Sequence, residues 1–364
     1  MITTMPIGSS PTLHQAAEVA ARVASGQTVY SLSTPTFDDR SGELKDVGWQ
    51  TGLSAPAGLP ELRKMARQNF FSRWRTPDHE CWISSGCKAA IFSIFRRHAN
   101  PGDTIVVVSP HWPSYDDLAR GVFCSPVHFQ TSLEENFEID AKRLDAFVAD
   151  LDRRAGVLVL SNPGNPTGKV HSATRLQGVV EVTERHGMAL VVDESFSGTV
   201  HDRDAWLEAP DINGALVYIV NSFSKNYHLQ GLRLGACLCP QEAFEDLVNI
   251  HQTVNSSPAS LSQAAALVMT QTSESCKQAF DLSKQWALTR EFVQDQGWKC
   301  WPSQGSFYCF PRINDFSTFR ARAAAANIFF LDGDTFGSSY ENHLRLCFCK
   351  PLDELDAIFS TLAA

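Results

Sequence analysis

The sequence predicts an α/β fold, in which a large domain with a mostly parallel sheet is joined to a smaller α+β domain. The first observation is an alternation of apolar strand-like runs with helical stretches. The runs lie at 104–108, 156–160, 188–192, 216–220 and 232–239, and the helical stretches near 87–98, 113–120, 140–152 and 171–186. Strands that are apolar along both faces are typical of a parallel sheet covered by helices.

The second observation is a change of pattern after Gln263. A helical stretch from about 273 to 296 precedes short strands around 306–310 and 344–348, with helices on either side. The length of 364 residues also exceeds one typical hydrophobic core. We therefore predict a large domain over 43–279 and a small domain formed by 1–42 together with 280–364.

Three elements are expected before the alternation begins. Residues 13–25 have apolar side chains at helical spacing and end near Gly26, and a short strand follows at 29–32. A further helix opens within 55–63, where Pro60 suits the first turn because its missing N–H has no partner there anyway.

Composition and charge exclude several classes of function. The chain is 43% hydrophobic and 20% charged, with a net charge of -9, which argues against nucleic acid or an anionic membrane surface as a partner. No apolar run approaches the roughly 20 residues that span a bilayer, and the start lacks the regions of a signal peptide. We expect a protein without membrane or nucleic-acid partners.

Ten cysteines could suggest disulfides, but most are scattered through apolar runs. Cys237/Cys239 and Cys347/Cys349 are C-x-C pairs, in which strand alternation puts both thiols on one face. Neither pair has the C-x2-C spacing usual for zinc, so we predict buried reduced thiols, no metal site and a cytoplasmic location.

The stretch 221–235 carries the strongest chemical signal. An apolar run at 215–220 leads to Ser222 and Ser224, which flank Lys225, and Arg233 follows between two glycines. A lysine amine attacks carbonyls when burial or a nearby cation lowers its pKa, and hydroxyls with a guanidinium suit a phosphate. This pattern indicates a Schiff-base lysine beside the phosphate of pyridoxal 5'-phosphate (PLP). The alternative is a surface lysine after a core strand.

Two more signals follow strand-like runs. Gly86, Cys87 and Lys88 open the helix near 87–98, whose free N–H groups form an anion site, although such helix starts are common. Trp112 lies in a proline-flanked loop after the run 104–108, where it could stack on a flat ring or be an ordinary half-buried tryptophan.

Three polar residues complete the set. Asn165 lies in Asn-Pro-Gly-Asn-Pro-Thr-Gly, a rigid turn that can aim its amide at a phenolic oxygen. Asp193 ends an apolar strand, where a carboxylate needs a positive partner such as a protonated pyridine nitrogen, or else caps a helix. Arg345 lies in a short apolar strand, suited to an amino-acid carboxylate or to a structural ion pair.

These motifs, in this order, resemble the class I/II aminotransferases of PLP fold type I, the aspartate aminotransferase-like family. The resemblance covers 29 to about 348 and is carried by A-P-A-G-L-P-E-L-R, S-G-C-K-A-A, N-P-G-N-P-T-G, V-V-D-E-S-F, S-F-S-K and G-L-R-L-G. It implies that Lys225 carries PLP and moves the α-proton, and that Asp193 pairs with the pyridine nitrogen. It also implies a homodimer with active sites at the subunit interface.

The resemblance implies roles for the other residues as well. Asn165 would bind the ring hydroxyl, Trp112 would stack on the ring, and Arg345 would bind the substrate α-carboxylate. The phosphate would be held by Ser222, Ser224, Arg233 and the backbone of Gly86, Cys87 and Lys88.

The chain departs from the family pattern at three positions. Phe196 stands where a tyrosine usually donates to the ring hydroxyl, Leu53 stands near a tyrosine that reaches the neighbouring subunit's phosphate, and Ser33 stands where many relatives have a glycine beside the substrate carboxylate. Losing the phenol at Phe196 should favour protonation of the lysine–cofactor imine. Some relatives with phenylalanine there catalyse oxidation or cyclisation.

We therefore expect a PLP-dependent enzyme that transfers the amino group of an L-amino acid to a 2-oxo acid. The alternative is a PLP-dependent lyase or cyclase that performs elimination, replacement or cyclisation in specialised metabolism. A regulator with an aminotransferase-like sensor domain would need a basic DNA-binding segment, for which we see no room before Val29. No second cation is evident for an acidic substrate; the candidates for a side-chain pocket are His111, Tyr115, Asn255 and Ser256.

Overall fold

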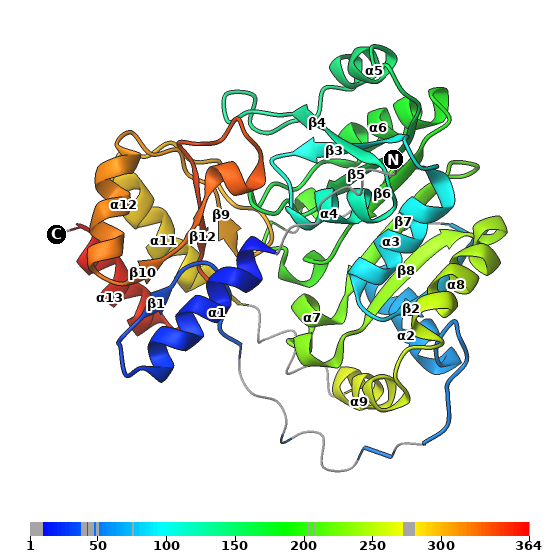
Figure 1. Cartoon of the computed structure of the whole chain (residues 1–364), viewed down its shortest axis with the longest axis horizontal. Coiled ribbons are helices and arrows are strands. Elements are labelled where there is room, and N and C mark those ends of the chain that lie inside the picture. Colours follow the sequence, from blue (N-terminus) through cyan, green and yellow to red (C-terminus); the bar gives the residue numbers. More distant parts are fainter. Residues whose placement is uncertain are drawn as a thin grey trace, which may run out of the picture.

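The chain forms two lobes, seen on the right and left of Figure 1. The structure is a computed structural model, and it describes residues 10–37, 42, 47–48, 51–74, 76–202, 204–206, 208–271 and 281–363. The larger lobe holds a seven-stranded sheet, and the smaller lobe holds a two-stranded and a three-stranded sheet.

The large sheet has the strand order β2-β8-β7-β6-β5-β3-β4. Strand β8 is antiparallel to both of its neighbours, and the pairs from β7 to β4 are parallel. The strands are β2 (His79–Ser84), β3 (Thr104–Ser109), β4 (Ser125–Gln130), β5 (Ala155–Ser161), β6 (Ala189–Asp193), β7 (Val217–Ser222) and β8 (Gly235–Pro240). The prediction of an α/β fold with a mostly parallel sheet is confirmed.

Helices cover both faces of this sheet, which explains why its central strands are apolar throughout. One core lies between the sheet and α3 (Cys87–His98), α4 (Ser114–Gly121) and α8 (Gln241–Asn255). The other lies between the sheet and α2 (Pro60–Phe70), α5 (Ala141–Ala149), α6 (Ala173–Arg185) and α9 (Ser260–Gln271). The short helix α7 (Phe223–Asn226) continues directly from β7.

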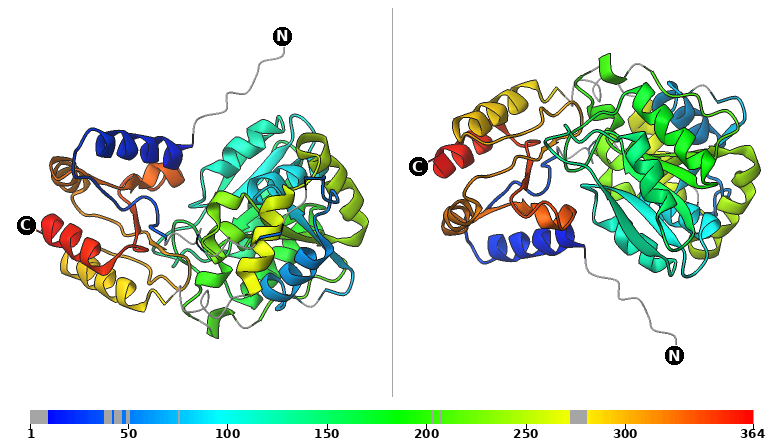
Figure 2. Two further views of the ribbon diagram at one scale, coloured as in Figure 1. Left: turned by 90° about the horizontal axis from the view of Figure 1, so that it is seen from below. Right: turned by 90° about the horizontal axis from the view of Figure 1, so that it is seen from above.

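The smaller lobe combines the first and last described parts of the chain. Strand β1 (Tyr30–Ser31) pairs with β10 (Ile328–Phe329), and β12 (Leu344–Cys347) lies between β11 (Leu331–Asp332) and β9 (Tyr308–Cys309). Its helices are α1 (Pro11–Ala24), α11 (Ser283–Asp295), α12 (Phe316–Ala325) and α13 (Leu352–Ala363). Helix α1 lies on this lobe in both views of Figure 2. The Gln15 amide of this helix donates to the Phe330 carbonyl at 2.7 Å.

Local sequence signals located most elements within a few residues, with one instructive error. The strand expected at 232–239 begins only at Gly235, because Gln230–Leu232 form a 3-10 turn and Arg233 has a left-handed φ of 54°. The first third of the helix expected over about 273–296 lies outside the described residues, and α11 begins at Ser283. Strands β2 and β4 and helices α8 and α9 were not predicted.

The proposed division at 42/43 and 279/280 stays a prediction, since residues 43, 279 and 280 lie outside the described residues. Nine cysteines fall within the described ranges and none of them forms a disulfide. Over those same ranges no helix has the length and apolar character needed to cross a bilayer.

Candidate active site

A cavity of about 610 Å³ lies where the carboxyl ends of the central strands face the smaller lobe. Ser161, Asp193 and Ser222 are the last residues of β5, β6 and β7, and hydrogen bonding sets Ser161 directly opposite Asp193. The cavity is lined by Ser10, Thr12, Leu13, Cys87, Lys88, Trp112, Tyr115, Ser161, Asn165, Asp193, Ser195, Phe196, Ser222, Ser224, Lys225, Gln230, Arg233, Tyr308 and Arg345. Most of the residues singled out in the sequence therefore meet in one place.

Lys225 brings an amine into this cavity from the first turn after β7. Burial is the largest cause that lowers the pKa of Lys225 to about 8, and the charges of Arg345 and Arg233 act in the same direction. The ammonium lies 5.6 Å from the Phe37 ring centre, and it has no ion pair with any described carboxylate. A lysine in these surroundings is neutral often enough near pH 8 to act as a nucleophile or base.

Asp193 faces the same cavity as a buried carboxylate. Its Oδ1 accepts hydrogen bonds from the backbone N–H of Ser195 at 3.0 Å and its hydroxyl at 2.5 Å, and its Oδ2 accepts from the Tyr115 hydroxyl at 2.7 Å. Burial raises the pKa of Asp193 despite these donors. Among the described side chains no cation pairs with it, so the carboxylate has a place for a positive partner in the cavity.

The start of α3 and the turn before β8 form an anion-binding cradle. Gly86 has φ +86°, and a Cβ placed there would lie 2.9 Å from Nη2 of Arg233, so only glycine leaves this space open. Arg233 donates to Ser224 Oγ at 3.4 Å and to the Gln230 carbonyl at 2.9 Å. First-turn N–H groups of a helix have no intrahelical partner, so α3 offers donors beside this guanidinium.

Cys87, in that first turn, is a buried thiol rather than a nucleophile. Its Sγ donates to the Asn221 carbonyl at 2.9 Å. Burial raises the pKa of Cys87 to about 12, so the thiol stays protonated at neutral pH. Cys87 therefore contributes to the cavity through its backbone and through the space that its side chain fills.

Lys88 presents its side chain to the cavity, whereas the sequence suggested only its backbone. Its Nζ lies 5.0 Å from the centre of the Trp112 ring, and the Trp112 ring stands edge-on to Tyr115. Burial lowers the pKa of Lys88. No described carboxylate forms an ion pair with this ammonium, which makes Lys88 a cation available to a ligand.

Arg345 is a further cation without an ion pair among the described residues. Its side chain is 1% exposed and lies 4.0 Å from the Tyr308 ring centre. It donates to Asn165 Oδ1 at 2.9 Å and to the Ser33 carbonyl at 2.6 Å, while its Nε has no hydrogen-bond partner among the described residues. No described carboxylate pairs with Arg345, so the alternative of a structural ion pair has no support.

The three departures from the family pattern lie at different distances from the cavity. Phe196 lines it and packs edge-on against the rings of Phe307 and Tyr308. Ser33 does not line it, but its carbonyl accepts a hydrogen bond from Arg345, which does. Leu53 is 85% exposed and does not line it, and its relation to a neighbouring subunit stays a prediction.

The residues suggested for a side-chain pocket are mostly elsewhere. Tyr115 lines the cavity, but its hydroxyl donates a hydrogen bond to Asp193. His111 is 3% exposed and contacts Asp116, while Asn255 and Ser256 end and follow α8, away from the lining. Tertiary contacts, which short motifs do not encode, place these side chains.

Sequence reasoning missed Ser195 and Tyr308 and gave Tyr115 a different role. Ser195 and Tyr115 hold the Asp193 carboxylate, and Tyr308 packs on Arg345. Ser195 follows two residues after the aspartate, a spacing at which an aspartate side chain often accepts from the backbone, so this contact had a local signal. The other two contacts join elements that meet only in the fold.

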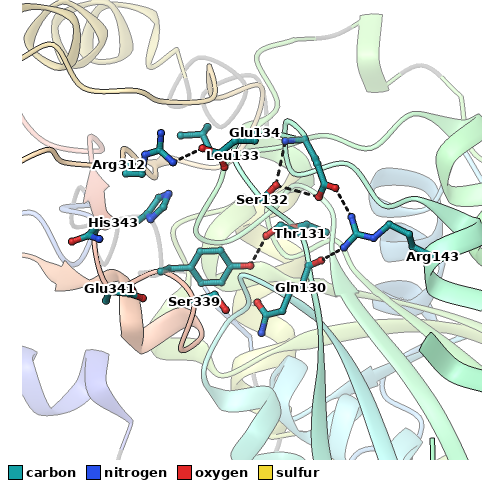
Figure 3. Close-up of a pocket in the computed structure, with 13 residues that line it drawn as sticks. Gln130, Thr131, Ser132, Leu133, Glu134, Arg143, Arg312, Ser339, Glu341 and His343 are labelled. Atoms are coloured by element: carbon teal, nitrogen blue, oxygen red, sulfur yellow. Dashed lines mark hydrogen bonds and ion pairs between the residues drawn. The ribbon is translucent and has the colours of Figure 1, made fainter. Parts of the chain in front are cut away.

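A second cavity of about 450 Å³ lies between the end of β4 and the segment 339–343 (Figure 3). Its two arginines are already matched: Arg312 pairs with Glu134, and Arg143 pairs with Glu135 at 2.6 Å. These ion pairs join neighbouring segments, and we assign no ligand to this cavity.

Comparisons with known proteins agree with this geometry. Residues 45–362 match the family model for aminotransferase class I and II. The aspartate/prephenate aminotransferase of Nitrosomonas europaea is 27% identical over 98% of this chain and 97% of its own, and the aspartate aminotransferase of Sulfurisphaera tokodaii is 26% identical over 77% and 72%.

Solved structures agree on the fold. The aspartate aminotransferase from Rhizobium meliloti matches with a TM-score of 0.85 at 25% identity, over 98% of this chain and 96% of that one. The Thermotoga maritima aspartate aminotransferase has the same TM-score at 21% identity and the same coverage. These matches support the aminotransferase prediction and give no support to the lyase or cyclase alternative. The chain belongs to the class I and II aminotransferases, a family of PLP-dependent enzymes.

Proposed function

We propose that this aminotransferase holds PLP covalently at Lys225 and acts on an α-amino acid whose α-carboxylate binds Arg345. The observation that carries the proposal is a set of buried charges without protein partners in one cavity. Lys225 and Arg345 have no described carboxylate beside them, and Asp193 has no described cation. Each of these charges matches a group that the cofactor or an amino acid would bring.

The residues present fit PLP. Asp193 would hold a proton on the pyridine nitrogen, since a buried carboxylate favours a positive partner. The cradle of Gly86, Arg233 and the start of α3 would hold the phosphate, and Trp112 would cover the ring. When bound, PLP supplies an electron-withdrawing system that makes the bonds at the substrate α-carbon easier to break.

The remaining chemistry falls to side chains of this chain. Lys225 Nζ, with its pKa lowered to about 8, would take the proton from the substrate α-carbon and deliver one during the return reaction. Arg345 would orient the substrate through paired N–H donors to its carboxylate, with Asn165 and the Ser33 carbonyl fixing the guanidinium plane. Asn165 would keep its amide N–H₂ for the ring hydroxyl.

Borohydride reduction of the cofactor-loaded enzyme, followed by peptide mapping, tests the attachment. The label should appear on Lys225, and Lys88 serves as an internal control because it lines the same cavity. Lys225→Ala should lose both the visible absorbance of bound cofactor and turnover. A label on Lys88, or an Ala variant that retains both properties, would overturn the assignment.

We further propose that the substrate has an acidic side chain. Lys88 offers an unpaired ammonium over Trp112 in the same cavity as Arg345, and the relatives named above are aspartate and aspartate/prephenate aminotransferases. A second carboxylate on the substrate would complement this second cation. No second cation was evident from the sequence, and Lys88 is the candidate that its place in the cavity supports.

The test compares aspartate and glutamate with alanine as amino donors at saturating cofactor. The wild-type enzyme should prefer the acidic donors, and Lys88→Gln should lower their kcat/KM by about tenfold or more relative to alanine, since an ion pair with a buried charge is lost. An unchanged ratio, or a wild-type preference for neutral donors, would refute an acidic substrate while leaving the PLP assignment intact.

We infer that the active enzyme is a homodimer in a reducing cytoplasm. The free cysteines of the described ranges support a reducing compartment. The family expectation of active sites at a subunit interface supports the dimer, and sedimentation of the purified enzyme would test it.

A further inference from the structure

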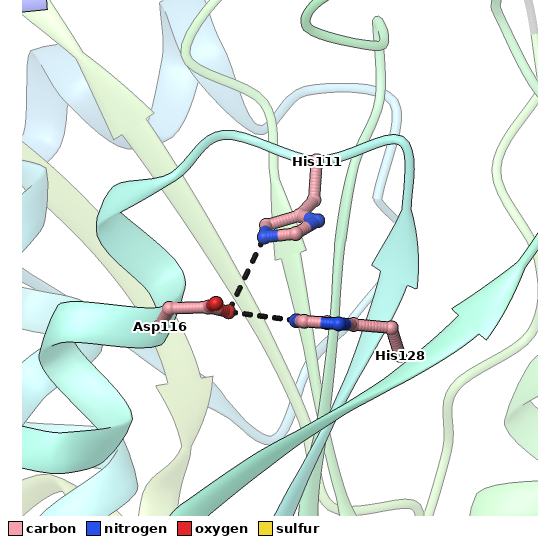
Figure 4. A group of neighbouring side chains, drawn as sticks. All are labelled: His111, Asp116 and His128. Atoms are coloured by element: carbon pink, nitrogen blue, oxygen red, sulfur yellow. Dashed lines mark hydrogen bonds and ion pairs between the residues drawn. The ribbon is translucent and has the colours of Figure 1, made fainter. Parts of the chain in front are cut away.

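Outside the cavity, two histidines and an aspartate converge on one point (Figure 4). His111 lies in the loop after β3, Asp116 lies in α4, and His128 lies in β4. Nε2 of His111 is 3.2 Å and Nε2 of His128 is 3.0 Å from the same oxygen, Oδ1 of Asp116. One ligand atom from each residue lies within 4.8 Å of the other two.

Two of the three spacings match those between ligands of a small divalent ion. A tetrahedral ion bound at about 2.0–2.1 Å to nitrogen and oxygen holds its ligand atoms roughly 3.3 Å apart. The two nitrogen–oxygen separations are 3.2 and 3.0 Å, so a movement of a few tenths of an ångström would admit the ion. The histidine rings are stacked, with centres 4.6 Å apart, which brings both nitrogens to the same side.

Hydrogen bonding at the far side of His111 accommodates the tautomer that a metal ligand needs. Ser109 Oγ lies 3.2 Å from the Phe336 carbonyl and 2.9 Å from Nδ1 of His111. When the hydroxyl donates to this carbonyl, Oγ accepts a hydrogen bond from Nδ1–H of His111. In that tautomer an unprotonated Nε2 faces a carboxylate oxygen, a contact between two acceptors that a cation would relieve.

The other oxygen of Asp116 is used by a neighbouring side chain, and His111 is buried, at 3% exposed. Arg120 reaches the other oxygen of Asp116 at 3.5 Å, which leaves Oδ1 to the two histidines.

We propose that His111, Asp116 and His128 form a binding site for one divalent transition-metal ion of the Zn²⁺ class. Two imidazoles and a carboxylate are ligands that suit zinc, copper, nickel and cobalt. The side chains of Asp116 and His128 are 16% and 27% exposed, so solvent can reach the site and supply a further ligand. The sequence-based expectation of no metal considered cysteine spacing alone and did not detect this site.

An ion there would stiffen a segment that also serves the cavity. Trp112 and Tyr115 lie between the two ligands His111 and Asp116 in the chain, and Tyr115 donates to Asp193. The ion would therefore act as a positioning element for the ring-covering tryptophan. It would take no part in the transfer of the amino group.

Zn²⁺ binding to the chelator-treated holoenzyme tests the proposal by calorimetry and by metal analysis after equilibrium dialysis. The wild type should bind one equivalent, and His128→Gln should weaken binding by about tenfold or more. His186→Gln is the matched control, because His186 also pairs with an aspartate, Asp145, at 2.8 Å but belongs to no three-residue cluster among the described residues. The control should bind like the wild type.

A spectroscopic measurement does not depend on that variant. Cu²⁺ added in one equivalent to the wild type should give an electron paramagnetic resonance signal with coupling to two imidazole nitrogens. That coupling should be lost in His128→Gln and kept in His186→Gln. Absence of stoichiometric Zn²⁺ binding to the wild type, or equal binding and equal spectra in the two variants, would overturn the site.

Discussion

The reactivity of Lys225 should follow an amine whose pKa is far below that of free lysine. Burial and the charges of Arg345 and Arg233 lower the pKa of Lys225 from 10.5 to about 8. At pH 7.5 roughly a quarter of such amines are neutral, against roughly 0.1% at a pKa of 10.5, which is an advantage of about 200-fold. Covalent attachment of the cofactor needs the neutral amine, so the attachment rate should be higher by the same factor.

The assay measures the rate at which PLP attaches to the cofactor-free enzyme as the pH is raised. Between pH 8 and 9.5 the rate should rise only about twofold, because the amine is already half neutral, whereas a pKa of 10.5 would give a rise of about thirtyfold. A free lysine derivative measured in parallel removes the contribution of the cofactor's own titration. A continued steep rise through pH 9.5 would refute the inference that burial and the two arginines activate this amine.

Three substitutions test the partners of the cofactor and the substrate. Arg345→Gln should lower kcat/KM for α-amino acids by about 30-fold or more, since truncating a buried charge pair costs about 2–5 kcal/mol. The same substitution should leave the reaction of an amine without an α-carboxylate nearly unchanged. Equal losses for both substrates would contradict carboxylate binding. Phe196→Tyr should lower the apparent pKa seen in the visible spectrum of the cofactor-loaded enzyme by restoring a donor to the ring hydroxyl, and an unchanged titration would show that this side chain does not face the ring. Asp193→Asn should raise the Tm of the cofactor-free enzyme, because it removes a buried charge without a cation partner, yet abolish turnover; a lower Tm would show that the hydrogen bonds from Tyr115 and Ser195 outweigh the burial of charge.

The elements that carry the chemistry were predictable because their signals are local. Helix α3 was expected at 87–98, which are its observed bounds, since a glycine precedes an apolar pattern of helical spacing. Asp193 and Ser222 end strands whose apolar runs are unbroken. In a parallel sheet the carboxyl ends meet at one edge, so these positions implied a common site.

The parts that could not be predicted depend on contacts distant in the chain. Strand β4 is a half-buried edge strand with Pro126 inside it, so it lacks the continuous apolar run that marked its neighbours. The bond from Tyr115 to Asp193 joins residues 78 positions apart. Likewise, the meeting of His111 with His128 requires β3 and β4 to pair. No short motif encodes these encounters.

The directions of the pKa shifts indicate how the cavity lowers the stability of the cofactor-free protein. The folded pKa of Asp193 is raised, so its contribution to stability is present at low pH and is lost as the pH rises through that folded value. The folded pKa of Lys225 is lowered to about 8, so stability rises with pH between about 8 and 10.5. Burial disfavours the charged forms of Asp193 and Lys225, and neither has an opposite charge beside it among the described residues; Arg345 is buried in the same way. A ligand that brings a cation to Asp193 and a carboxylate to Arg345 would remove these penalties. The unmatched charges thus destabilise the cofactor-free fold, and under the proposed assignment they would also select a zwitterionic amino acid.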